Sequence, residues 1–299
     1  MITPSFALTA TERVLPKLAL DFTTASLDPR VTFTRALNTA TVTNSSGYIV
    51  SINAGLPRFD YNPITLACNG LLIEESRTNV VYDSAFQTIS GSSTPNNVWY
   101  DNIAALNTTS NYAVSPDNTQ NACLLAVNTN TSSAAIAYKT GITTTGTYAF
   151  SVYAKPASTD TAMSIIVSGD VAAANYIRVP FTLSGNGTVG ATTLVGTATA
   201  PTAASISKAA NGYYRCIVVV TLTSPTNIYS GIYPGNRSAQ TTASQTLVWG
   251  AQVEVGAFAT SYIPTTTTAL TRNADVATMT GTNFSSWYNQ TEGAFEVQC

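Results

Sequence analysis

The sequence predicts an all-β protein whose main part is an antiparallel β-sandwich of the jelly-roll type. Charged residues make up only 9% of the 299-residue chain, against about 25% in an average soluble domain, so Thr, Ser and Asn must supply most of the polar surface. Thr and Val are β-branched and favour strands. No segment of a dozen residues keeps the apolar spacing of an amphipathic helix. We therefore expect strands joined by turns.

Residues 1–80 differ from the remainder because they contain a large share of the charged residues. Short alternating runs such as Val31-Thr32-Phe33-Thr34 are separated by Asp28-Pro29 and by Asn44-Ser45-Ser46-Gly47, which favour turns. Glu75 and Arg77 would share one face of a strand and pair, whereas the neighbours Glu74 and Glu75 would point apart. The segment is predicted to be rich in hairpins, tied by ion pairs and too poor in apolar residues to fold without a surface to lie on.

Residues 81–265 are predicted to form the jelly-roll sandwich. Apolar residues alternate with polar ones in several runs, and turn sequences such as Ser184-Gly185-Asn186-Gly187 lie between the runs. Strict alternation places Cys216 and Trp249 on inward faces and Glu254 on the face opposite Trp249. The apolar positions of these runs are Tyr148, Phe150, Val152, Met163, Ile165, Val167, Cys216, Val218, Val220, Leu222, Leu247, Trp249, Ala251, Val253 and Val255.

Residues 266–299 are predicted to be a linker followed by the start of another β unit. The run Thr265-Thr266-Thr267-Thr268 has low complexity, as a linker or an extended edge would. The final run, Ala294-Phe295-Glu296-Val297-Gln298-Cys299, alternates like a strand but has no partner after it. We interpret it as the first strand of a C-terminal domain.

The composition argues against several classes of function. A net charge of −2 with no basic cluster disfavours nucleic acid. The chain has no run of about 20 apolar residues, which a membrane-spanning helix would need. Met1–Ala10 lacks the features of a signal peptide. The four cysteines, Cys68, Cys123, Cys216 and Cys299, are scattered without a C-x-x-C pair, so we expect reduced thiols, no metal and no cofactor.

Catalysis is also disfavoured, because the chain has no histidine. A glycosidase would need only two carboxylates about 5–9.5 Å apart. The central acids are few, however, and Asp160, Asp170 and Asp275 sit among turn or linker residues, which leaves Glu254 in a strand without an evident partner. We expect no enzymatic activity.

Aromatic residues beside Asn and Gly are the candidate contacts to a carbohydrate, because sugars stack on flat aromatic faces. Alternation places one member of each adjacent pair inward, so only the outward members could touch a ligand. The candidates are Trp99, Tyr100, Tyr213, Tyr214, Tyr229 and Tyr233.

Several segments resemble a family of tailed-bacteriophage virion proteins, usually described as head-spike, fibre or tail proteins. The N-terminal part is similar through LDFTT (20–24), DPRVTFTR (28–35), PRFDY (57–61) and GLLIEESRTN (70–79). The central part resembles the carbohydrate-binding-module-like jelly rolls of that family through YAFSVYAK (148–155), GYYRC (212–216) and VWGAQVE (248–254), and the likeness continues through TSYIPT (260–265) and TRNAD (271–275).

The resemblance implies a virion component assembled in the cytoplasm of a bacterial host. Its leading function would be structural, as a head or tail appendage subunit in contact with capsid, portal or tail proteins. It also implies a concanavalin- or laminin-G-like domain after the sandwich. Two alternatives remain open: a module that recognises a host surface glycan, and the non-catalytic part of a depolymerising tailspike.

We further predict a homo-oligomer docked through residues 1–80. In that assembly Arg30, Arg35, Arg58 and Arg77 would pair with carboxylates of neighbouring copies or of the virion. A trimer is favoured over a dimer by the resemblance to phage fibres, which are commonly threefold.

Overall fold

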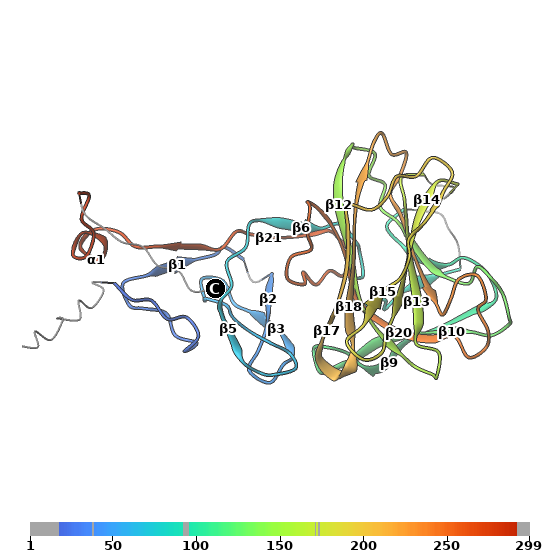
Figure 1. The fold of residues 1–299 in the computed structure, drawn as a ribbon, viewed down its shortest axis with the longest axis horizontal. Helices are drawn as coiled ribbons and strands as arrows, with labels where there is room; N and C mark the ends of the chain where they lie inside the picture. Colours follow the sequence, from blue (N-terminus) through green and yellow to red (C-terminus); the bar gives the residue numbers. More distant parts are fainter. Residues whose placement is uncertain (1–17, 38, 92–95, 171, 173, 292–299) are drawn as a thin grey trace, which may run out of the picture.

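The computed structural model describes residues 18–37, 39–91, 96–170, 172 and 174–291. The molecule has two parts, a β-sandwich and an elongated extension that projects from one side of it (Figure 1). We call the extension the arm; it comprises residues 18–79 and 266–291. None of the helices in the described ranges has the length and apolar character needed to cross a lipid bilayer.

The sandwich consists of two facing sheets in which neighbouring strands are antiparallel, except for the parallel pair β7 and β8. The first sheet runs in the order β17 (Ala203–Lys208), β18 (Tyr214–Leu222), β12 (Gly146–Pro156), β20 (Gln245–Val255), β10 (Gln120–Val127) and β9 (Leu106–Val114). The second runs in the order β15 (Thr188–Val189), β14 (Tyr176–Thr182), β13 (Ala162–Ser168), β19 (Tyr229–Pro234), β11 (Ile136–Lys139), β8 (Trp99–Asp101) and β7 (Ile89–Ser90), with β16 (Thr193–Val195) also on β14.

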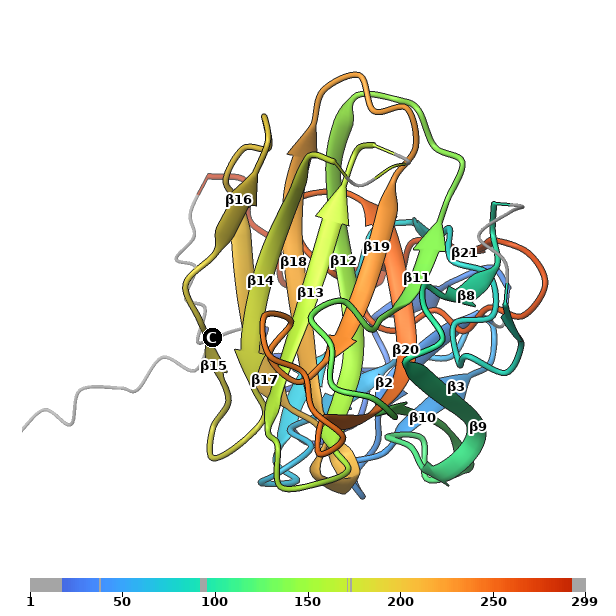
Figure 2. The same ribbon diagram turned by 90° about the vertical axis from the view of Figure 1, so that its right-hand side faces the viewer.

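The strand order confirms the all-β sandwich and has the connectivity of a jelly roll. The chain crosses from one sheet to the other between β10, β11, β12 and β13, and again between β18, β19 and β20 (Figure 2). As a result β18-β12-β20-β10 faces β14-β13-β19-β11. The predicted turn at residues 184–187 joins β14 to β15 as a hairpin, with Phe181 opposite Val189.

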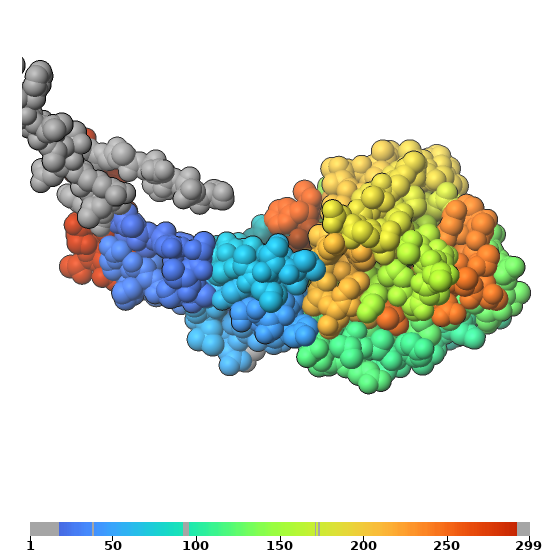
Figure 3. Space-filling model, turned by 60° about the horizontal axis from the view of Figure 1, so that its bottom comes forward, coloured from blue at the N-terminus to red at the C-terminus, as the bar shows by residue number. Residues whose placement is uncertain are grey.

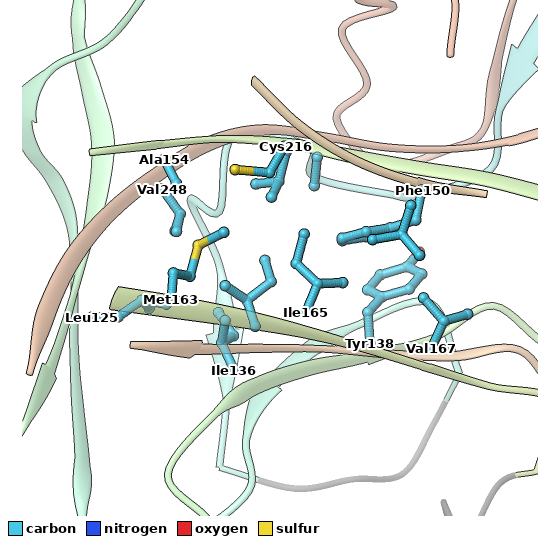
Figure 4. Close-up of a cluster of buried hydrophobic side chains, with 14 of the residues drawn as sticks. Leu125, Ile136, Tyr138, Phe150, Ala154, Met163, Ile165, Val167, Cys216 and Val248 are labelled. Carbon is cyan, nitrogen blue, oxygen red and sulfur yellow. The ribbon is translucent and has the colours of Figure 1, made fainter. Parts of the chain in front are cut away.

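The core between the sheets is formed by the inward side of the predicted alternation (Figure 4). Phe150 and Cys216 from the first sheet meet Met163, Ile165 and Val167 from the second, and all five are buried. Burial of these side chains supplies the main stabilisation of the sandwich. The thiols of Cys68, Cys123 and Cys216 are free, as expected, and Cys216 lies in this core; Cys299 lies outside the described residues.

The prediction that Trp249 lies in this core is wrong, because a β-bulge reverses the alternation within β20. Gly250 adopts φ +64°, and the pairing of β20 with β12 shifts between Ser151 and Tyr153. Val248 and Ala251 therefore both point inward, while Trp249 points outward and packs with Tyr153. Trp249 and Glu254 consequently share the outer face rather than opposing one another.

The arm is a series of two-stranded ribbons. Its pairs are β1 (Thr32–Thr34) with β22 (Val276–Thr278), β2 (Ala40–Thr43) with β3 (Ile49–Ile52), β4 (Phe59–Tyr61) with β5 (Cys68–Leu71), and β6 (Arg77–Asn79) with β21 (Leu270–Arg272). A short helix, α1 (Thr282–Ser285), follows at the end distant from the sandwich (Figure 1). A single turn of 3₁₀-helix, η1 (Ala210–Gly212), joins β17 to β18.

The sequence suggested that residues 266–278 belong to a linker between two domains, but they do not. They run back along the arm, and β21 and β22 supply partner strands for β6 and β1. Thr265, the first residue of the threonine run, is buried, and its hydroxyl donates to the carbonyl of Val81 at 2.6 Å. The strand expected at 294–299 lies outside the described residues.

Candidate functional site

Three predicted sugar contacts converge on the outer face of the second sheet. Tyr100, Tyr229 and Tyr233 form one cluster, with Tyr176 packed against it. Gly231 leaves space between two of them, since a Cβ atom there would meet the rings of Tyr233 at 3.0 Å and Tyr229 at 3.3 Å. We call these four tyrosines the tyrosine face.

The tyrosine face is covered rather than open. Tyr100, Tyr229 and Tyr233 are only 5%, 6% and 4% exposed. The Arg237 guanidinium lies 4.9 Å from the ring centre of Tyr176 and 5.2 Å from that of Tyr233, in cation–π geometry. Burial raises the pKa of Tyr100 to about 12 and raises that of Tyr229 further. A sugar could stack here only after Arg237 had moved away.

The other three candidates are also buried. Trp99 and Tyr214 lie between the two sheets, so the prediction that they contact a ligand is wrong. Tyr213 lies outside the first sheet, where it packs with Trp249 and Tyr262. Each adjacent pair thus has one inward and one outward member, as alternation predicted, but the outward rings are covered by the remainder of the chain.

The arm meets the sandwich at a buried group of charged side chains, the junction cluster, formed by Arg35, Arg58, Glu74, Arg272 and Asp275. Asp275 accepts from Arg35 at 3.0 Å, is paired with Arg58, and accepts the backbone N–H of Glu74 at 2.9 Å. Glu74 pairs with Arg58 at 2.8 Å and lies 3.5 Å from Arg272. The side chains of the three arginines and of Asp275 have no exposed surface.

This arrangement corrects the predicted docking role of Arg35 and Arg58. Both side chains direct their donors into the chain, where Arg35 also donates to the carbonyl of Asn53 at 2.7 Å and Arg58 to that of Thr41 at 2.9 Å. Neither can meet a carboxylate of another molecule. Arg30 is more accessible and pairs with Asp28 at 2.7 Å, while Arg77 pairs with Glu75 as predicted.

Charge neutralisation in the junction cluster lowers the pKa of Glu74. Burial alone would raise this pKa. The positive charges of Arg272 and Arg58, together with the hydrogen bonds donated by Ser261, lower it by more than burial raises it. A carboxylate with a lowered pKa in the folded state stabilises that state above its unfolded pKa, and the stabilisation is lost as the pH falls through the folded value.

We therefore expect the free energy of unfolding to decrease as the pH falls below about 4.3, the ordinary value for glutamate. Glu74→Gln should reduce the steepness of that decrease, because the variant has no proton to bind at this position. Urea denaturation at a series of pH values measures it. Glu75→Gln, at a side chain that is 58% exposed, is the control. It should leave the decrease in the free energy of unfolding at acid pH unchanged. If the free energy of unfolding decreases equally steeply at acid pH in Glu74→Gln and in the unmodified chain, the lowered pKa of Glu74 is contradicted.

Glu254, which the sequence places in a strand without an evident partner, is buried, and both of its carboxylate oxygens accept hydrogen bonds. One oxygen accepts from Gln252 at 2.6 Å and from the backbone of Thr260 at 2.8 Å, and the other accepts from the Thr260 hydroxyl at 2.6 Å. These bonds fix the loop that follows β20. Within the described ranges no group of three or more Cys, Asp or Glu residues is arranged to hold a metal ion.

A cleft of about 580 Å³ lies beside the junction cluster, between the arm and the first sheet. The arm contributes β2, Asp60 and the turn at residues 62–65, and the sandwich contributes Tyr153, Ser207, Lys208 and Arg215. Its size is within the range of small-molecule sites. We call it the junction cleft; it lies where the arm and the sandwich adjoin in the space-filling view (Figure 3).

The sheet side of the junction cleft follows from strand register. Ser207, Arg215, Tyr153 and Trp249 are successive cross-strand neighbours on β17, β18, β12 and β20. The Arg215 guanidinium lies 5.4 Å from the ring centre of Tyr153. Burial raises the pKa of Tyr153, Arg215 opposes this shift, and the charges of Asp60 and Glu74 reinforce it. No local pattern of residues indicates this site, although Arg215 stands out as a lone cation within an apolar strand.

Comparison with known proteins adds little to this description. No family model matches the chain. No curated protein matches it either. Among solved structures, the chain is similar to a protein from Bacteroides thetaiotaomicron described as a "putative sugar binding protein", with 12% identity and a TM-score of 0.37 over 60% of this chain and 100% of that one. A similarity of this size does not bear on the ligand or on the function.

Proposed function

We propose that the chain is a non-catalytic structural subunit of an external appendage on a phage particle, attached through the arm and presenting the sandwich outward. The observation that carries the proposal is the exposure of the arm. Isolated two-stranded ribbons are at best marginally stable in water, and this arm consists of such ribbons. The resemblance of its segments to phage head-spike, fibre and tail proteins supports the particle as the setting.

An apolar patch on the arm is the proposed contact. Leu37, Leu56, Ile73 and Val276 are 59%, 52%, 48% and 46% exposed. They come from segments that adjoin: Arg35 donates to the carbonyl of Leu56, Asp275 donates its backbone N–H to the carbonyl of Glu74, which follows Ile73, and Val276 is the strand partner of Thr34. We call these four residues the arm patch. Exposed apolar groups gathered in this way mark sites of protein contact.

A non-catalytic role is supported by the sequence and by the placement of the acids. The chain contains no histidine. Glu74, Glu254 and Asp275 accept hydrogen bonds that hold the arm and the loop after β20 in place. Groups committed in this way are poorly placed to exchange protons with a substrate.

The arm patch can be tested on particles. A phage whose copy of the gene is deleted would be grown on cells that supply the chain from a plasmid, and purified particles would be immunoblotted. Leu56→Asp combined with Ile73→Asp should reduce the amount on particles at least about tenfold, since charges would enter an apolar contact. Val189→Asp combined with Leu194→Asp, at sandwich side chains that are 36% and 46% exposed, should not.

The outcomes separate the two parts of the proposal. Absence of the unmodified chain from purified particles would overturn the particle assignment. Full occupancy of the arm-patch variant would overturn attachment through the arm. Deletion of residues 1–80 is a poorer test, because it would also remove the partners of β21 and β22.

We also propose that the appendage is a homo-oligomer, with three copies favoured by the resemblance to phage fibres. The low charge of the chain reduces repulsion between copies. Sedimentation velocity of the purified chain measures the number of copies.

A further inference from the structure

The junction cleft has the chemistry of a saccharide site. Its walls present hydroxyls, amides and charged groups, including Thr43, Asn62 and Asn186. A polyhydroxylated ligand needs many hydrogen-bonding groups at short spacing. The arrangement is also preformed, because strand register fixes Ser207, Arg215 and Tyr153 side by side.

Arg215 has donor groups to spare. Its Nη2 donates to the Ser151 hydroxyl at 3.1 Å and to the carbonyl of Thr260 at 2.6 Å. Its Nε makes no hydrogen bond within the described part of the chain but is buried, and no bond of Nη1 is formed there either. The two bonds from Nη2 and the contact with Tyr153 fix the guanidinium plane, so Nη1 is the donor that is held in place for a ligand.

The other charged groups of the cleft indicate the charge of that ligand. Asp60 already accepts from the backbone of Thr43 at 3.2 Å and from Asn69 at 3.0 Å. Glu74 is paired with Arg58 and bonded to Ser261 at 2.7 Å. The ammonium group of Lys208, by contrast, has no hydrogen-bond or ion-pair partner among the residues described. The acids are thus engaged, whereas the two cations have unused donors.

We propose that the junction cleft binds a saccharide that bears a carboxylate, a hexuronate or a sialate, with the acid group on Nη1 of Arg215 and on Lys208 and the hydroxyls on the polar groups of the walls. Hydrogen bonds between ionised partners are stronger than neutral ones, which favours these two cations as the anchor. Ser207, opposite Arg215 and exposed, lies at the rim of the site. This inference goes beyond the structural role proposed above and does not depend on attachment to a particle.

Isothermal titration of the purified full chain at low salt would test the proposal. The probes are tetragalacturonic acid, an α2,8-linked trimer of N-acetylneuraminic acid, and neutral maltotetraose. At least one acidic probe should bind about tenfold or more tightly than maltotetraose, and the acidic probe that binds identifies the source of the carboxylate. Binding of neither acidic probe, or equal binding of maltotetraose, would overturn the proposal.

Two variants locate the site. Ser207→Trp should fill the cleft from an exposed position and weaken binding at least about tenfold. Ala203→Trp is its control, because Ala203 is exposed on the same face of β17 but four residues away and outside the cleft. Arg215→Gln should also abolish the preference for acidic probes, with thermal melting used to check that the fold survives. Unchanged binding by Ser207→Trp would show that the ligand binds elsewhere. A failure here leaves the particle experiment unaffected, since that experiment reports only on the arm.

Discussion

Replacing Asp275 with alanine is expected to lower the free energy of unfolding by about 3–5 kcal/mol, because the change leaves buried guanidinium groups without their counter-charge. Asp275 accepts from Arg35 at 3.0 Å, pairs with Arg58, and lies 3.9 Å from Arg272. The Arg272 nitrogens already lack hydrogen-bond partners among the described residues. Loss of Asp275 would leave Glu74 as the remaining carboxylate of the junction cluster, facing three buried arginines.

Urea denaturation of the full chain measures this effect. Asp28→Ala is the matched control, because Asp28 also pairs with an arginine, Arg30, but both side chains are partly exposed. Exposed pairs contribute little to stability, so the control should change far less than Asp275→Ala. Equal stability of Asp275→Ala and the unmodified chain would mean that water, rather than the carboxylate, satisfies the three guanidinium groups.

Trp249→Ala is expected to cost about 3–5 kcal/mol, the usual range for removing a large buried aromatic side chain. Trp249 is 2% exposed. Its ring lies 5.5 Å from that of Tyr153 and 4.5 Å from that of Tyr262, so the cavity would open on the outside of the first sheet. Tyr262 precedes the segment that enters the arm, and the variant should therefore loosen the arm as well as the sandwich.

Thermal melting with a matched tryptophan variant tests this expectation. Trp287 is only half-buried and lies just beyond α1, so Trp287→Ala should lower the melting temperature much less. Limited proteolysis would report on the arm separately, since cleavage near residues 260–270 should become faster in Trp249→Ala alone. A melting temperature unchanged by Trp249→Ala would exclude the outer cluster as a source of stability.

The sandwich could be predicted from the sequence because its core obeys a local rule. Alternation correctly placed Phe150, Cys216, Met163, Ile165 and Val167 inward. It failed at Trp249 because one inserted residue, Gly250, changes the phase of every position after it. A glycine in a strand is a weak signal of a bulge, and nothing else in the local pattern distinguished the two phases.

The junction could not be predicted, because it depends on contacts between residues far apart in the chain. Arg58 and Asp275 are 217 positions apart. Strand β21, which follows the sandwich in the chain, pairs with β6, which precedes it. Arg35 and Arg58, which we predicted to pair with carboxylates of another molecule, therefore pair with carboxylates of their own chain. The predicted aromatic contacts failed similarly, because alternation assigns a side chain to a face but does not reveal what covers that face.

The pairing of β6 with β21 makes the sandwich an exchangeable cassette. The chain leaves the arm after Asn79 and returns at Leu270, and these two residues are direct partners in the ribbon, so their Cα atoms lie about 5 Å apart. A different domain with adjacent termini could occupy this position while the ribbons of the arm kept their own pairings. Recombination at these two points would exchange the sandwich and retain the arm, the proposed means of attachment.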